Sequence, residues 1–159
     1  MSPAKVATAL GTAGLITTLV GTFLPWLQSG GVRRNSYTSF GVLRRLIGFH
    51  GAAEATIRIW PLLGVACAIV VLVALAGLWR SAAALGLLVA AWSATVAGGA
   101  LARDPVGPVR VDLLGPIVTV LGSTATAAAA ILTLIAQIRP GTGGTLSDRA
   151  AGAIRRSAR

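Results

Sequence analysis

Four long apolar blocks most constrain what this chain can fold into. They cover about residues 6–26, 59–79, 82–101 and 113–138. Each block has about 20 residues or more, the length that a helix needs to cross a hydrocarbon core of roughly 30 Å. The blocks and short connections use nearly all of the 159 residues, and the mean hydropathy is +0.80. We therefore predict an all-α polytopic membrane protein, with a four-helix transmembrane domain at 1–139 and no independent soluble domain.

The one long polar interval separates the first two blocks, at about residues 28–58. Trp26 and Trp60 mark its edges, and Gln28–Gly31 is typical of a turn. From Phe40 to His50 the apolar residues recur with a helical period, so that one half of the helical wheel is apolar. Arg44 and Arg45 lie on the other half.

This run is too short to span a membrane, but two placements suit it. It can lie in the membrane interface with its apolar face down and its arginines toward headgroups. It can also form a lid that packs on the end of the helix bundle. Several helix-capping residues precede it, between Asn35 and Ser39. We predict the interfacial placement, a short amphipathic helix between the first two spans, with the lid as the alternative.

Small residues recur every fourth position in two of the blocks. In the third block they form a predicted helix-packing seam of five residues: Ala82, Gly86, Ala90, Ala94 and Gly98. In the first block the corresponding stripe contains Ala9, Ala13, Thr17 and Gly21. Small side chains let another helix approach closely in lipid. Residues 122–130 of the fourth block are almost all Gly, Ala, Ser and Thr, and we expect them to be buried against other helices.

Aromatic residues and a short connection suggest where the second block ends. Trp60 and Trp79 stand at its two ends, as in the aromatic belts of membrane helices. Arg80 and Ser81 predict a tight turn between the second and third blocks. Trp92 lies in the middle of the third block, where it can fill a groove inside the bundle or face a partner or a lipid tail.

The charge of the chain is strongly basic, with 14 Lys and Arg against 4 Asp and Glu and a net charge of +10. The basic residues lie between and after the apolar blocks, which favours anionic lipid headgroups over nucleic acid as the partner. Four spans place both termini on one side, and seven basic residues then fall on each side of the membrane. Lys5 precedes the first helix, which usually sets orientation. We predict a plasma-membrane protein with both termini and the basic tail 140–159 in the cytoplasm.

Residues with obvious chemistry are scarce. The four blocks contain no Asp, Glu, Lys, Arg or His, which argues against a self-contained transporter because ion pathways usually need such groups at membrane depth. His50 and Glu54 stand four apart, but no third ligand accompanies them, so an i,i+4 contact is the simpler interpretation. Cys67 is the single cysteine. We predict no catalytic residues, no cofactor and no metal site.

One segment resembles a known family. Phe23-Leu24-Pro25-Trp26-Leu27-Gln28-Ser29-Gly30, followed by Arg33-Arg34-Asn35-Ser36-Tyr37, resembles small four-span membrane proteins of actinobacteria. It is similar to the accessory membrane subunit found with the mycobacterial Mce lipid-import machine. The resemblance covers the general layout and this segment. It implies a partner, the permease pair of an ATP-driven importer of fatty acids or sterols, and it implies no catalytic residues.

The leading hypothesis is a non-enzymatic accessory subunit of a larger cell-envelope complex. It would dock laterally through its small-residue faces and through the arginine-bearing loop. The predicted partner or lipid contacts are Trp26, Arg33, Arg34, Tyr37, Arg44, Arg45 and Trp60.

The alternative hypothesis is a small homo-oligomeric channel or carrier. Its path would be lined by hydroxyl side chains of the first and fourth blocks: Thr17, Thr18, Thr22, Thr119, Ser123, Thr124 and Thr126. Hydrogen bonding between helices, or back to the carbonyls of the same helix, is the competing role for these residues.

Overall fold

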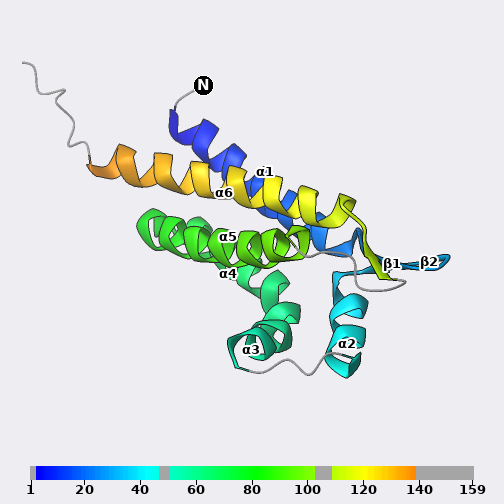
Figure 1. Cartoon of the computed structure of the whole chain (residues 1–159). Helices are drawn as coiled ribbons and strands as arrows, with labels where there is room; N and C mark the ends of the chain where they lie inside the picture. Colours follow the sequence, from blue (N-terminus) through cyan, green and yellow to red (C-terminus); the bar gives the residue numbers. More distant parts are fainter. Residues whose placement is uncertain (1–2, 47–50, 103–108, 139–159) are drawn as a thin grey trace, which may run out of the picture.

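The computed structural model describes residues 3–46, 51–102 and 109–138, and most of them are helical (Figure 1). The long helices are α1 (Pro3–Phe23), α4 (Leu63–Leu75), α5 (Trp79–Leu101) and α6 (Leu114–Ile138). The shorter α3 (Ala52–Ile59) and a 3-10 turn (Trp60–Leu62) lead directly into α4.

Four helical segments of the described chain are long and apolar enough to cross a membrane. They are Val6–Phe23, Glu54–Leu75, Trp79–Leu101 and Leu114–Gln137. The prediction of a mainly helical fold with four such segments is therefore confirmed. The second segment begins earlier than the predicted residue 59 because α3 continues it toward its N-terminus.

The long helices pack side by side in an order that differs from their order in the sequence. α6 lies between α1 and α5, and α4 packs on α5 (Figure 1). α1 and α4 touch each other only over a short stretch. Neighbours are antiparallel, so that α1 begins and α6 ends at the same end of the bundle, where the α4–α5 turn also lies.

The contact between α1 and α6 brings the two backbones together. A Cβ atom at Gly122 would lie 2.6 Å from Thr18 Oγ1 and 2.8 Å from the Gly14 carbonyl oxygen. A Cβ at Gly14 would lie 2.7 Å from the backbone nitrogen of Thr126. Only glycine fits at these positions, which is the close approach that small residues permit between helices in lipid. The prediction that residues 122–130 are buried is confirmed for Gly122, Ser123, Thr126, Ala129 and Ala130, whereas Thr124 and Ala128 are exposed.

The predicted stripe of α1 is wrong as a contact face, because Ala9 and Ala13 are exposed. The buried face has residues at alternating spacings of four and three, including Ala7, Gly14 and Gly21. Each step of four residues turns about 40° beyond a full helical turn, whereas alternating steps of four and three keep side chains on one face.

The predicted seam of α5 shows the same rotation. Ala82, Gly86 and Ala90 are buried inside the molecule, whereas Ala94 and Gly98 are half-buried. A Cβ at Gly98 would meet nothing within 4 Å. The first three residues therefore pack against the protein's own helices, and docking of a partner through this face stays a prediction.

The turn between α4 and α5 lies at residues 76–78, so the predicted turn at Arg80 and Ser81 is wrong. Gly77 has φ 78°, a left-handed conformation that suits glycine after the end of a helix. Leu78 N–H donates to the Val73 carbonyl (3.1 Å), and Gly77 N–H donates to the Ala74 carbonyl (3.0 Å). These bonds end α4 at Leu75, and consequently Trp79 begins α5 rather than ending the second span.

A small β-sheet corrects the all-α prediction. β1 (Pro25–Ser29) pairs antiparallel with β2 (Val32–Asn35) on one side and with β3 (Val109–Val111) on the other. The hairpin turn uses Gly30 at φ 59°, a value that favours glycine at the first central position. Trp26 therefore lies in a strand, and the first span ends at Phe23 instead of residue 26.

α2 (Ser36–Leu46) begins four residues before the predicted start at Phe40. The Asn35 side chain caps it, because Asn35 Oδ1 accepts the backbone N–H of Thr38 (3.0 Å).

His50 and the tail 140–159 lie outside the described residues, as do the side chains of Arg44 and Arg45.

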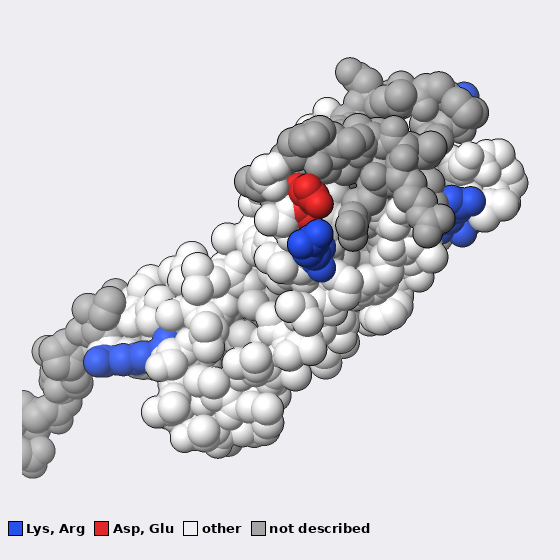
Figure 2. Space-filling model, turned by 90° about the horizontal axis from the view of Figure 1, so that it is seen from below, with Lys and Arg blue, Asp and Glu red and all other residues white. Residues whose placement is uncertain are grey.

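Charged side chains are few on the face shown in Figure 2. Basic side chains lie near both ends, an acidic and a basic side chain lie together between them, and most of the remaining surface is uncharged. Large apolar side chains of the long helices are exposed, among them Leu72 (64% exposed), Leu88 (68%) and Leu121 (62%).

Candidate functional site

The end of the bundle where α1 ends and α6 begins is closed by a structure that we call the cap. It consists of the three-stranded sheet, α2 and the 3-10 turn Trp60–Leu62 (Figure 1). The cap contains all the predicted contact residues and most of the polar side-chain contacts of the described chain that join different elements.

An aromatic cluster forms the interior of the cap. The Trp60 ring packs edge-on against three others, with centroid distances of 5.7 Å to Trp26, 5.5 Å to Phe40 and 5.7 Å to Trp92. Trp26 and Phe40 also contact each other at 5.8 Å. Edge-on packing of this kind adds to the stabilisation from burying the rings. Trp92 therefore fills the interior of the bundle, the first of the roles predicted for it.

Trp26 and Trp60 are core residues of this fold, with 2% and 1% exposure. Their predicted contact with a partner or with lipid is wrong for this structure. Each indole N–H is satisfied internally: Trp26 Nε1 donates to the Gly21 carbonyl (2.8 Å), and Trp60 Nε1 donates to Ser36 Oγ (3.0 Å). A buried tryptophan whose indole N–H is already hydrogen-bonded needs no contact with a partner protein or with lipid.

Short polar contacts join α2 to the end of α1. Ser36 Oγ, which accepts the Trp60 N–H, itself donates to the Thr22 carbonyl (2.7 Å). The Thr22 hydroxyl lies 3.1 Å from the hydroxyl of Tyr37, whose ring contacts Phe23 at 5.3 Å. With Phe40 in the aromatic cluster, these contacts pack the start of α2 on the bundle end, as the lid alternative requires. Its contact with lipid stays a prediction.

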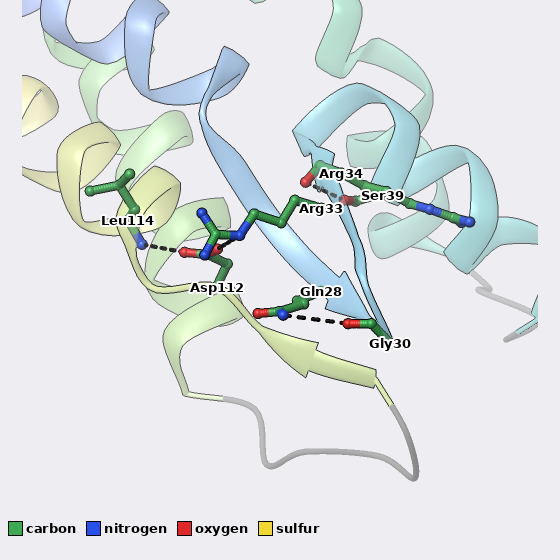
Figure 3. A network of polar contacts seen from close by, with 7 residues as sticks. All are labelled: Gln28, Gly30, Arg33, Arg34, Ser39, Asp112 and Leu114. Atoms are coloured by element: carbon green, nitrogen blue, oxygen red, sulfur yellow. Dashed lines mark hydrogen bonds and ion pairs between the residues drawn. The ribbon is translucent and has the colours of Figure 1, made fainter.

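Asp112 joins the sheet to α6 (Figure 3). Its N–H donates to the Trp26 carbonyl (2.9 Å), and its Oδ1 accepts the N–H of Leu114 (3.2 Å) at the start of α6. Its other carboxylate oxygen lies 3.9 Å from Arg33 Nε. One turn further, a Cβ at Gly115 would overlap the Trp26 indole and lie 2.7 Å from the Pro25 carbonyl oxygen.

Two arginines line up across the sheet. Gln28 on β1 stands opposite Arg33 on β2 and opposite Arg110 on β3. Directly opposite residues point to the same face of a sheet, about 5 Å apart per strand. We call Arg33, Gln28 and Arg110 the arginine row. Both arginine residues are exposed.

Arg34 is separate from this row, because successive strand residues point to opposite faces. Figure 3 shows its side chain directed away from Arg33, and its carbonyl accepts the Ser39 hydroxyl (3.3 Å). Thus the predicted pair Arg33-Arg34 serves two different surfaces.

The charge of the arginine row is only partly compensated. Asp112 is the one carboxylate within 4 Å of it in the described part of the chain, and that ion pair is long. The Arg33 side chain is 66% exposed, and exposed pairs of this kind contribute about 0–1 kcal/mol. Asp112 also serves as the α6 cap, so the row keeps a net positive charge.

Sequence reasoning missed Arg110 as a member of this site. The signal was the alternation Val109-Arg110-Val111, which is typical of a short strand with one polar face. The pairing of that strand with β1 could not be read locally, because residues 30–108 of the chain separate the two.

Glu54 makes a different local contact from the predicted one. It lies 3.7 Å from the Arg58 guanidinium one turn later on α3. His50, the predicted partner, lies outside the described residues. In the described ranges, no group of three His, Cys, Asp or Glu side chains could hold a metal ion.

Most of the hydroxyls that could line a path form hydrogen bonds within the described part of the molecule. Thr18, Thr119, Ser123 and Thr126 are buried, and each donates to the carbonyl four residues earlier. Ser93 of α5 and Ser123 of α6 lie 2.7 Å apart, which is a hydrogen bond between helices. These contacts match the role of hydrogen bonding within and between helices. No observation on these hydroxyls favours a path through a single copy of the described chain.

Fold and cap together define a class: a mainly helical protein with four segments long and apolar enough to span a membrane, closed at one end by a small sheet and an aromatic cluster. In comparisons with known protein families, with curated proteins and with solved structures, no match to this chain is found. The resemblance to the accessory subunit of the Mce machine stays a prediction.

Proposed function

We propose that this chain is a multi-pass membrane protein that serves as a non-enzymatic accessory subunit of a larger cell-envelope complex. Exposed Leu, Ile and Val side chains on all four long helices support insertion into lipid. Apolar surface of this extent is unfavourable in water. Lys5, just before the spanning segment Val6–Phe23, and the basic tail favour cytoplasmic termini, and the cap then lies outside.

The observation that carries the proposed role is the arginine row. Its two arginines stand on a sheet that Trp26 of the aromatic cluster and Asp112 join to the bundle. A guanidinium binds carboxylates or phosphates with two parallel hydrogen bonds, so a fixed pair of them suits an acidic surface of a partner protein. The spanning helices supply close packing, and the row supplies discrimination between partners.

The partner class follows from this chemistry. We expect an integral membrane complex that presents Asp or Glu side chains at the outer membrane surface, such as the permease subunits of an ATP-driven lipid importer. Anionic headgroups are the competing ligand for the same arginines. Arg44, Arg45 and Tyr37 stay predicted contacts beside the row.

The test is purification of the tagged chain in a mild detergent, followed by measurement of the mass and composition of the complex. A larger partner at a fixed stoichiometry supports the accessory subunit. A homo-oligomer without other proteins supports a channel or carrier instead, and it would overturn the proposal.

Arginine variants then test the role of the row. Arg33→Lys and Arg110→Lys keep the charge but lose the forked geometry. If the row docks on a protein, these variants should reduce partner recovery, because disrupting a buried charged pair at an interface costs about 2–5 kcal/mol. Arg58→Lys is the matched control, since Arg58 lies off the row and pairs with Glu54. If both row variants recover the partner in full, only the charge of the row matters and not its forked geometry. That result is expected if the row binds lipid headgroups.

A further inference from the structure

An apolar groove lies between α1 and α4, in the half of the bundle opposite the cap. α1 packs on α6 and α4 packs on α5, so the two outer helices leave a gap between them. The volume of the groove is about 140 Å³. Its floor consists of small buried residues of α5 and α6: Ala82, Gly86, Ala129 and Ala130.

The walls of the groove open to the outside of the bundle. Thr8 and Thr12 of α1 line it and are exposed, and so is Leu75 of α4, at 78%. The groove therefore faces the surroundings of the helices rather than a closed interior.

A positive charge lies beside one end of the groove, next to its lining residues Trp79 and Thr133. Trp79, which lines the groove and is 46% exposed, precedes Arg80. Arg80 Nε donates to Gln137 Oε1 (2.9 Å), and Gln137 follows the lining residue Thr133 by one helical turn. This bond holds the guanidinium across the ends of α5 and α6. The two carboxylates in the described ranges are Glu54 on α3 and Asp112 beside the sheet, and neither lines the groove.

We infer that the groove holds part of one acyl chain of an anionic phospholipid, with the headgroup at Arg80. The inference rests on the proposed insertion into a membrane. A cavity of about 150 Å³ takes a benzene-sized hydrocarbon group. A helix with its side chains is about 10 Å across, too wide for this space. The apolar walls match the hydrocarbon chain, and the cation at their end matches a phosphate. An indole at the mouth is typical of the membrane interface.

The experiment uses the full chain in lipid nanodiscs of phosphatidylcholine doped with a photoactivatable phosphatidylglycerol, whose diazirine is at the end of one acyl chain. Cross-linked residues are mapped by mass spectrometry. We expect labels on the groove-facing residues of α1 and α4, and weaker labelling by the phosphatidylcholine analogue. Arg80→Gln should reduce the preference for phosphatidylglycerol about fivefold, because the variant removes one basic group beside the headgroup.

Filling the groove should abolish the specific labels. Ala74→Phe fills it from the half-buried wall of α4, and Gly86→Leu fills it from the floor. The matched control is Leu88→Phe, which enlarges a residue of α5 that is 68% exposed and does not line the groove. Ala74→Phe keeps the test valid if Gly86→Leu fails to fold.

Three results would overturn the inference: labels spread evenly over all four helices, labels that persist in Ala74→Phe, or cross-links to a second copy of the chain seated in the groove. Equal labelling by the two lipids would overturn the assignment of the headgroup site to Arg80. Carbonate extraction of cell membranes separates this failure from failure of the proposed function. A chain that carbonate releases is not inserted, and both ideas then fail, whereas a retained chain without groove labels removes only the lipid site.

Discussion

Gly122→Ala should loosen the contact between α1 and α6. The added Cβ would lie 2.6 Å from Thr18 Oγ1 and 2.8 Å from the Gly14 carbonyl oxygen. Non-bonded atoms settle at about 3.5–4.0 Å, so the helices must separate by roughly an ångström. Overpacking of this kind costs about 1–3 kcal/mol, and the better helix propensity of alanine offsets up to about 1 kcal/mol. We expect a net loss of about 1–2 kcal/mol in the free energy of unfolding.

The assay is unfolding in mixed micelles of a mild detergent and SDS, followed by tryptophan fluorescence and circular dichroism. Gly98→Ala is the control, because Gly98 also lies inside a long helix but a Cβ there would meet nothing within 4 Å. That variant should be neutral or slightly stabilised. If Gly122→Ala and Gly98→Ala unfold at the same SDS fraction, the backbone contact between α1 and α6 is not what holds these helices together.

Three further substitutions test separate contacts in the same unfolding assay. Gly77→Ala should cost about 1–2 kcal/mol, because φ 78° places an L side chain in the left-handed region; an unchanged midpoint would mean that the α4–α5 turn is built differently. Ser36→Ala removes the partner of both the Trp60 N–H and the Thr22 carbonyl, and it should cost about 1–3 kcal/mol. No loss of stability and no change in tryptophan emission would contradict that bond arrangement. Ser123→Ala should cost only about 0.6 kcal/mol, since Ser93 keeps its bonds to the Val89 and Ala90 carbonyls; a loss several times larger would show that the link between the helices dominates.

The sequence predicted the long helices well because their signal is local. The length of the apolar blocks alone locates the four segments, and the capping residues near Asn35 indicate the start of α2. The predicted face of α1 was wrong because it took every fourth residue, and residues at that spacing move gradually around the helix instead of staying on one face. Ala7, Gly14 and Gly21, seven residues apart, were the better signal.

The cap could not be predicted in the same way, because it is held by contacts between residues that are distant in the sequence. From the sequence, Trp60 is typical of an aromatic belt, and Trp26 marks the other edge of the polar interval. Both are buried because the sheet and α2 fold over them and bring Phe40 and Trp92 into contact with Trp60. β3 has only three residues, so its pairing with β1, and with it the arginine row, could not be predicted from local pattern.

The central claim is that the chain crosses a membrane with its cap outside and the α4–α5 turn inside. The most direct measurement is labelling of single cysteines by an impermeant maleimide in intact cells, in a Cys67→Ala background. Gly31→Cys reports on the cap, since Gly31 is exposed with open space around it, and Ser81→Cys reports on the exposed start of α5. We predict that Gly31→Cys is labelled in intact cells and that Ser81→Cys is labelled only after the membrane is permeabilised. Labelling of Ser81→Cys in intact cells, with or without labelling of Gly31→Cys, would contradict the account.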